Sequence, residues 1–440
     1  MSDVAPAPPT RAAPASDPPP ALTRAQLAAG RRRATASLVA GVALGSTGHI
    51  AAITVATIVA KDLLGSQLLA GAPGATVVLG AALGAVLLSA YMARVGRRRG
   101  LVLGYTIGVV GALVATAAVI TRSFPLLLLG TLLIGFGNTS NQLSRYTNAD
   151  MAPVARRASA ISLIVWASTV GSVIGPQMVP FASGLAEGVG LPPLAGPYLV
   201  PVLFVGIAAI LSWVMLRPDP YDLAEDDAVH RSDVKIPTAP LRAILGRPTV
   251  TAAIVALVFS QLVMVLIMTM TPLHMTEHGH DLGAVGIVLS AHTLGMFAFS
   301  PVSGRLTDRF GTTTVIFLGT AVLAVSSVMA AMAPPDGGTV LLLALFLLGL
   351  GWNFGFVAGS ALLSGSLEIH ERTRIQGVAD AMIWSSAAAA SLGSGFVMAV
   401  VGYTALGIMG ALAVIIPVVV LLSHRRTVRR AEVTPEILPS

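Results

Sequence analysis

The sequence contains no cysteine among its 440 residues, and only 11% of the residues are charged and 5% are aromatic. Without cysteine, disulfide bonds and thiolate metal sites are excluded, so a soft metal ion would need methionine or histidine ligands. The low share of charged residues, set against 55% hydrophobic residues, excludes an ordinary soluble protein of this length. The composition therefore indicates an integral membrane protein.

The sequence also lacks the features of an enzyme. No set of residues stands in a pattern that would assemble a nucleophile, a base and a group that orients the base, and a phosphate-binding GxxxxGK[ST] motif is absent. The longest polar interval between hydrophobic segments, about residues 217–248, is too short for a separate catalytic domain. We therefore expect neither an enzyme nor a membrane-bound sensor.

Hydrophobic segments of about 20 residues follow one another from residue 35 onward, each long enough to cross ~30 Å of hydrocarbon as a helix. The expected spans are about 35–60, 70–93, 101–120, 124–146, 158–183, 197–216, 249–273, 283–306, 314–333, 338–364, 376–400 and 403–423. The sequence thus predicts an all-α membrane protein with twelve transmembrane helices in two six-helix halves, 35–216 and 249–423, joined by a cytosolic loop, 217–248. Residues 1–34, rich in proline and alanine, are expected to be a disordered cytosolic tail, and residues 424–440 a second cytosolic tail.

The formal net charge of +7 comes from basic residues in the tails and in alternate loops. If the N terminus is cytosolic, all but three of the 27 basic residues lie on the cytosolic side; Lys61 and Arg122 lie outside, and Arg145 lies within a predicted helix. Short cytosolic loops of membrane proteins are rich in lysine and arginine. We therefore expect a multi-pass protein of the inner (plasma) membrane, with both termini cytosolic, that contacts the lipid bilayer and binds no nucleic acid.

The two halves repeat each other at an interval of about 215 residues, which indicates a duplicated six-helix unit. The sequence ARVGRRR at 93–99 corresponds to DRFGTTT at 308–314, and GFGN at 135–138 corresponds to GLGW at 349–352. The interval from Arg156 to Trp166 likewise equals that from Arg374 to Trp384.

One of these repeated motifs carries a family resemblance. The run GRLTDRFG at 304–311 resembles the cytosolic loop motif of the major facilitator superfamily, and the resemblance extends over residues 35–422. It implies the fold of that superfamily and transport by alternating access, as a monomer. The motif glycine permits close helix approach, and the aspartate can contact the N-terminal amides of a neighbouring helix, which latches the cytosolic face.

The N-terminal copy of this loop departs from the pattern, since Ser89 replaces the glycine and Ala93 replaces the aspartate. The latch usually made by that copy is therefore not expected here. The gating residues that the resemblance implies across both copies are Arg94, Gly96, Arg97, Gly304, Asp308, Arg309 and Gly311.

Two pairs of residues point to a soft metal. Met264 and Met268 on the seventh predicted helix, and His292 and Met296 on the eighth, stand four residues apart, so each pair shares a helix face. Counted from the outer helix ends at ~1.5 Å per residue, Met264 and His292 lie at the same depth. Thioether and imidazole ligands favour Cu(I), although methionine is also a normal filler of transmembrane packing.

These MxxxM and HxxxM motifs resemble those of the copper-importing, CcoA-like branch of the superfamily. The resemblance implies that Met264, Met268, His292 and Met296 bind metal and that copper, as the ion or a small chelate, moves into the cytosol. Copper would then be a substrate rather than a cofactor, with a cytosolic copper chaperone as a downstream partner. The alternative is efflux of apolar drugs or other small molecules, for which a methionine-rich helix would be a pliable apolar wall.

Other polar residues allow two interpretations each. His274, Met275, His278 and His280 lie between the seventh and eighth predicted helices, where they would face the outside and either collect metal or form an ordinary solvated loop. Five further polar residues fall within predicted spans, where they either line a cavity or couple transport to protons, or else serve as contacts between helices. They are His49, Asn141, Arg145, Gln261 and Asp380.

Overall fold

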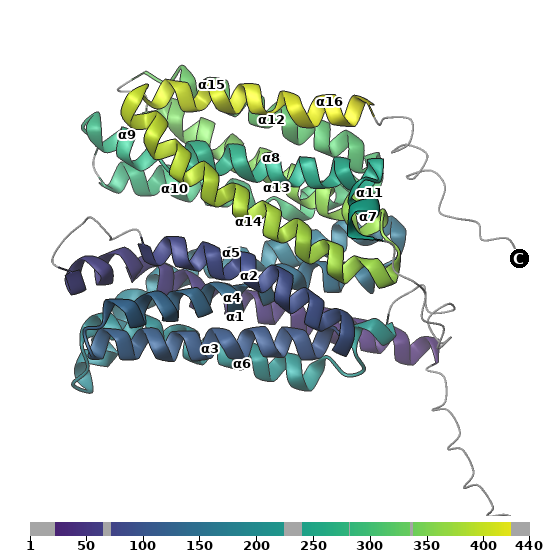
Figure 1. The fold of residues 1–440 in the computed structure, drawn as a ribbon, viewed down its shortest axis with the longest axis horizontal. Helices are drawn as coiled ribbons and strands as arrows, with labels where there is room; N and C mark the ends of the chain where they lie inside the picture. Colours follow the sequence, from purple (N-terminus) through teal and green to yellow (C-terminus); the bar gives the residue numbers. More distant parts are fainter. Residues whose placement is uncertain (1–22, 65–71, 224–239, 281, 335–337, 424–440) are drawn as a thin grey trace, which may run out of the picture.

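The computed structural model describes residues 23–64, 72–223, 240–280, 282–334 and 338–423, which form a bundle of long helices (Figure 1). The first half contains α1 (Arg24–Leu64), α2 (Ala72–Val95), α3 (Arg97–Ile120), α4 (Phe124–Asp150), α5 (Arg157–Gly188) and α6 (Gly196–Met215). The second half contains α7 (Leu241–Leu245), α8 (Pro248–Met268), α9 (Thr271–Glu277), α10 (Leu282–Phe297), α11 (Ser300–Phe310), α12 (Thr312–Ala331), α13 (Gly338–Gly365), α14 (Ile369–Val400), α15 (Tyr403–Ala413) and α16 (Ile415–Ser423).

The described residues contain 11 helical segments that are long and apolar enough to cross a membrane. The helix α4 is the remaining long helix of the bundle, and its second half is polar because it carries Asn138, Asn141, Gln142 and Arg145. The predicted eighth span consists of α10 and α11, and the predicted twelfth consists of α15 and α16. The fold expected from the sequence, twelve helices in two halves, is therefore present.

The boundaries of several segments differ from the prediction. Helix α1 begins at Arg24, inside the segment expected to be a disordered tail, and the predicted seventh span ends at Met268. The interval expected to be a loop around His274 is helical, as α9. The 3₁₀ turn η3 (Pro220–Leu223) and α7 flank the central loop, while residues 1–22, 224–239 and 424–440 lie outside the described residues.

The duplication is visible in the backbone. Gly96 precedes α3 with φ 96°, and Gly311 precedes α12 with φ 86°. Glycine is the residue that adopts this left-handed region without a steric penalty. The two loop motifs therefore share one backbone conformation, although their side chains have diverged.

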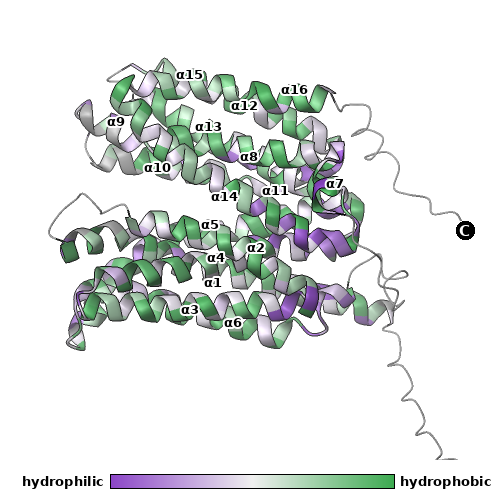
Figure 2. Cartoon of the chain, viewed as in Figure 1, coloured by the Kyte–Doolittle hydropathy of each residue, from purple (hydrophilic) through white to green (hydrophobic). Residues whose placement is uncertain are grey.

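The two halves lie closest together at the end that carries α7 and α11 and diverge toward the end that carries α9 (Figure 1). Hydrophilic residues gather at the closer end, as Figure 2 shows. The closer end carries the arginines at the start of α3, Arg97, Arg98 and Arg99, and those on α11, Arg305 and Arg309. We therefore call the closer end the arginine-rich end and the opposite end the α9 end. Helix α2 packs against α14, and α5 packs against α11, across the boundary between the halves.

Candidate functional site

A cavity of about 340 Å³ lies between the two halves. Its wall is formed by residues of α1, α4, α5, α8, α10, α13 and α14, so both halves contribute to it. Small-molecule sites in proteins commonly enclose ~300–1,000 Å³. All five polar residues singled out from the predicted spans line this cavity: His49, Asn141, Arg145, Gln261 and Asp380.

An ion pair joins the halves at the cavity wall. Arg145 of α4 donates from Nη2 to Oδ1 of Asp380 on α14 at 2.5 Å, and each side chain is only 2% exposed. The guanidinium also lies over the rings of Tyr146 and Phe356, with its Cζ 4.3 and 4.4 Å from their centroids. A buried charge requires such compensation, because an unpaired one inside a membrane protein is costly.

The remaining donors of Arg145 are also engaged. Nη1 donates to the backbone oxygen and to Oε1 of Gln142, at 2.7 and 3.0 Å, and Nε donates to Oγ of Ser360 at 3.4 Å. Among the described residues, by contrast, Oδ2 of Asp380 and Nδ1 of His49 have no hydrogen-bond partner although both atoms are buried. Leaving such an atom unsatisfied costs about 1–3 kcal/mol. At a cavity wall these atoms are positions where a bound solute gains hydrogen bonds.

Aromatic side chains form another part of the wall. Trp352 stacks on Phe356 with centroids 4.5 Å apart and an interplanar angle of 18°, and Phe297 meets Trp352 edge-on at 5.9 Å. Trp352 donates from Nε1 to Oε1 of Gln261 at 2.7 Å, which fixes the orientation of the indole. Trp384 also lines the cavity, four residues after Asp380 on α14, so the two side chains share a helix face.

The four residues expected to form a metal ladder are not brought together. Met264, Met268 and Met296 line the cavity. His292, however, is fully buried against α13, where its Nδ1 lies 2.9 Å from the backbone oxygen of Leu345. The structure therefore corrects the expected placement of His292, which is turned toward the packing of its own half.

The residues expected to collect metal outside also differ in placement. His274 stacks on Tyr403 with centroids 4.2 Å apart, and Nδ1 of His278 lies 2.7 Å from the backbone oxygen of His274. Met275 is 1% exposed and so does not face the outside as expected, while His280 is half-buried beside Gly338. Within the described part of the chain, no three His, Asp or Glu side chains converge as a metal site.

The C-terminal loop motif closes the arginine-rich end. Asp308 of α11 accepts hydrogen bonds from the backbone N–H groups of Ala158 and Ser159, at 3.1 and 3.0 Å, and from the Ser159 hydroxyl. These groups form the N-terminus of α5, where a negative charge is favourable. Gly304 lies so close to α5 that a Cβ there would stand 2.2 Å from Oγ of Ser162. Arg309, by contrast, is exposed.

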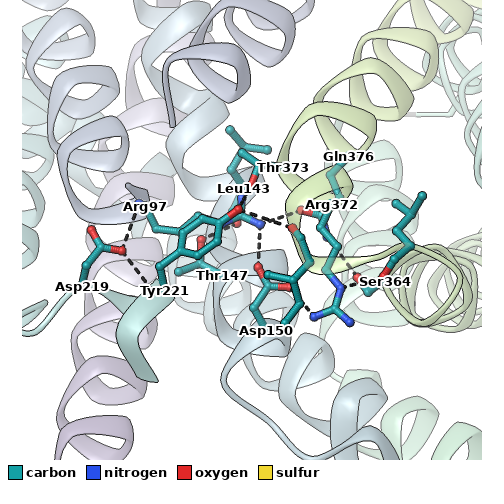
Figure 3. A network of polar contacts seen from close by, with 12 residues as sticks. Arg97, Leu143, Thr147, Asp150, Asp219, Tyr221, Ser364, Arg372, Thr373 and Gln376 are labelled. Atoms are coloured by element: carbon teal, nitrogen blue, oxygen red, sulfur yellow. Dashed lines mark hydrogen bonds and ion pairs between the residues drawn. The ribbon is translucent and has the colours of Figure 1, made fainter. Parts of the chain in front are cut away.

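The N-terminal loop motif is completed by a residue from the central loop. Asp219 accepts a hydrogen bond from the backbone N–H group of Arg97 at 3.2 Å, at the N-terminus of α3 (Figure 3). It accepts a second one from the backbone N–H group of Arg98 at 3.0 Å. A carboxylate thus caps this motif although Ala93 supplies none. Asp219 was not singled out from the sequence, although an acidic residue directly after the sixth predicted span was a usable signal for a helix-capping carboxylate.

The same segment reaches the other half. Tyr221 donates to the backbone oxygen of Ile369 at 3.4 Å and lies 3.2 Å from Oγ1 of Thr373, both on α14. The buried side chain of Arg97 contacts Asp150 at 2.6 Å and Oε1 of Gln376 on α14 at 2.8 Å (Figure 3). Arg94 is exposed. We call residues 219–223 the strap, because they tie α3 to α14.

A further ion pair holds the entry of α8 to α14 within the second half. Arg247 donates from its two terminal nitrogens to the two carboxylate oxygens of Glu371, at 2.6 and 2.8 Å. Hydrogen bonding to Glu371 raises the pKa of Arg247, so this guanidinium stays charged at every physiological pH.

Comparison with known proteins places the chain in a family. The model of the Major Facilitator Superfamily matches residues 36–284 and 254–438. The chain is 38% identical over 86% of its length to the uncharacterized MFS-type transporter YddS of Bacillus subtilis (strain 168), covering 87% of that protein. It is 30% identical over 83% of its length to the riboflavin transporter RfnT of Brucella anthropi, covering 88% of that protein.

Solved structures share the fold. The human organic anion transporter MFSD10 (TETRAN) superposes with a TM-score of 0.70 at 16% identity, over 89% of this chain and 99% of that one. A bacterial homologue of the iron transporter ferroportin in an outward-facing state gives a TM-score of 0.67 at 16% identity, over 89% of this chain and 98% of that one. At this identity the likeness is one of fold.

Proposed function

Since the chain belongs to the Major Facilitator Superfamily and is therefore a secondary transporter, we propose that it carries a planar heteroaromatic molecule of the flavin kind. The observation that carries this proposal is the cavity of about 340 Å³, with aromatic rings and a buried ion pair on its wall. A metal ion needs a few converging ligands and little space. A planar organic solute needs a pocket of this size, flat apolar surfaces and a few polar groups.

The similarity to a riboflavin transporter supports the flavin class. That relative is 30% identical to this chain over most of its length. Riboflavin carries a planar tricyclic ring system with a polar edge. Trp352, Phe356 and Trp384 offer rings to a flat solute, and Arg145 and Asp380 offer polar groups beside them. The size of the cavity and the residues that line it therefore agree with such a substrate.

Counterflow in proteoliposomes tests the proposal without assuming a direction of transport. Vesicles loaded with unlabelled riboflavin and diluted into labelled riboflavin should accumulate label transiently when they contain the full chain. Trp384→Ala should reduce the affinity for riboflavin, and with it the accumulation of label, by about tenfold, because a stacking surface is lost. Trp166→Ala is the matched control, since Trp166 is 40% exposed on α5 and does not line the cavity. Riboflavin accumulation no greater than in empty vesicles would contradict the proposal.

Copper import is the second candidate, because three methionines line the cavity: Met264, Met268 and Met296. The position of His292 against α13 leaves this set without its expected imidazole. Copper accumulation in cells that lack their own copper importer decides between the candidates. If copper is the substrate, alanine at all three methionines should abolish accumulation, whereas Met332→Ala, 75% exposed and away from the cavity, should not. If a flavin is the substrate, wild type should accumulate no copper above the empty vector.

The proposed orientation places the arginine-rich end in the cytosol and the α9 end outside. The arginines at the start of α3 and on α11 lie at the first end, and basic residues are enriched on the cytosolic side of membrane proteins. The contacts of Asp308 and of the strap then close the cytosolic side, and the structure corresponds to the outward-facing state of the transport cycle. The direction of net transport, import or efflux, is measured by imposing the riboflavin gradient across the vesicle in each sense.

A further inference from the structure

We propose that the Arg145–Asp380 pair recognises the imide edge of the flavin ring by hydrogen bonding, with Trp384 stacking on the ring itself. This inference rests on the proposed function and names the part of the substrate that two residues recognise. An imide edge presents a carbonyl oxygen next to an N–H group, and so needs a donor beside an acceptor.

The ion pair offers these two groups side by side. Asp380 contacts Arg145 through Oδ1 alone, and its second oxygen, Oδ2, has no hydrogen-bond partner among the described residues. Arg145 makes that contact through Nη2, so its Nη1 is the adjoining nitrogen. The ring N–H of the imide therefore meets Oδ2, and the neighbouring carbonyl meets Nη1.

One existing contact yields to the ligand. Nη1 of Arg145 donates to the side-chain oxygen of Gln142 at 3.0 Å as well as to its backbone oxygen at 2.7 Å. Gln142 is half-buried and lines the cavity, so its amide can turn away while the backbone contact remains. The ligand carbonyl replaces one neutral acceptor with another, and the number of hydrogen bonds to Arg145 is conserved. The hydrogen bond to Oδ2 is a net gain.

The position of Trp384 completes the geometry. It follows Asp380 by four residues on α14, so the indole and the carboxylate face the cavity from successive turns. A flat ring that lies on the indole therefore directs its polar edge toward Asp380. Because Arg145 belongs to α4 and Asp380 to α14, a ligand bound here contacts both halves, as alternating access around a central site requires.

Binding of riboflavin and of its 3-methyl derivative to the purified full chain tests the inference. Methylation removes the imide N–H, and loss of one hydrogen bond to a charged acceptor should weaken binding to wild type by about 10- to 150-fold. Quenching of flavin fluorescence gives the dissociation constants. A riboflavin analogue that carries one additional carbon at the opposite, benzenoid edge of the ring is the matched ligand, and its affinity should stay within a few-fold of that of riboflavin.

Asp380→Asn shows whether Asp380 is the acceptor. An amide keeps the size of the side chain but places an NH₂ group or a neutral oxygen where the ligand N–H would bind. The variant should bind riboflavin more weakly, and the 3-methyl penalty should shrink to a few-fold.

The outcomes separate this inference from the proposed function. Riboflavin binding that 3-methylation leaves unchanged in wild type overturns the inference alone, and needs no variant to do so. A 3-methyl penalty that persists at full size in a folded Asp380→Asn protein also overturns it. If riboflavin does not bind wild type at all, the proposed flavin substrate is wrong, and the inference falls with it.

Discussion

The contact between Asp308 and the first turn of α5 allows a quantitative prediction about the transport cycle. The carboxylate accepts hydrogen bonds from the N–H groups of Ala158 and Ser159 and from the Ser159 hydroxyl, and so ties the two halves at the arginine-rich end. A hydrogen bond to a charged group contributes ~1.5–3 kcal/mol. Because Asp308 is only half-buried, we assign about 3 kcal/mol to the whole contact, less than the sum of its parts.

Asp308→Ala should therefore destabilise the state closed at this end by about 3 kcal/mol, a roughly 150-fold shift in the equilibrium. A conformation open at the arginine-rich end and populated at ~1% would rise to roughly 60%. Asp308→Asn keeps an acceptor but loses the charge, and should give an intermediate shift.

Labelling of a single cysteine measures this shift. The chain has no cysteine of its own, so Ser172→Cys on the cavity wall introduces the one reactive thiol. An impermeant maleimide added outside intact cells should label this cysteine at less than half the parent rate when Asp308 is alanine. Arg305→Ala, an exposed change on the same helix, should leave the rate unchanged. Equal labelling rates in Asp308→Ala and its parent would refute the assignment of closure to this contact.

Three further predictions follow from other contacts. Asp219→Ala removes the carboxylate at the N-terminus of α3 and should cost about 1–2 kcal/mol, seen as a lower thermal midpoint; an unchanged midpoint would show that the strap adds no stability. Gly377→Val should abolish counterflow, because a Cβ there stands 1.8 Å from Oγ of Ser89, while Gly393→Val on the same helix meets open space and should retain it. In intact cells His278→Cys should react with an impermeant maleimide and Arg305→Cys only after permeabilisation, and the reverse pattern would invert the proposed orientation.

Hydrophobic length and internal repetition sufficed to predict the fold. Span length follows from the thickness of the bilayer, and the motif pairs at equal intervals revealed the two halves. The break in the eighth span, between α10 and α11, was not predicted, although Pro301 at the start of α11 was a usable signal, because a proline interrupts the helix that precedes it. The strap was missed for a different reason. Its contacts with α14 join residues about 150 positions apart, which local patterns do not report.

The candidate site was predicted in part. Spacing placed Met264 and Met268 on one face, and both line the cavity. The same rule failed for His292 and Met296, because four residues advance a helix by about 40° beyond a full turn, so a pair at the edge of a cavity can straddle its boundary. Spacing fixes how two side chains are related along one helix. The rotation of that helix against its neighbours, here α13, is set by packing that the sequence does not display.

The ion pair between Arg145 and Asp380 also has a consequence for how the protein is made. The two residues are 235 positions apart, so Arg145 enters the membrane during synthesis long before its partner exists. An uncompensated arginine costs ~2.5–3.5 kcal/mol on insertion scales at the centre of a helix, which is an upper bound for Arg145 because it lies nearer the end of α4. The first half therefore remains an incompletely satisfied intermediate until α14 arrives, and a chain truncated before that helix would expose a charge that membrane quality control can recognise.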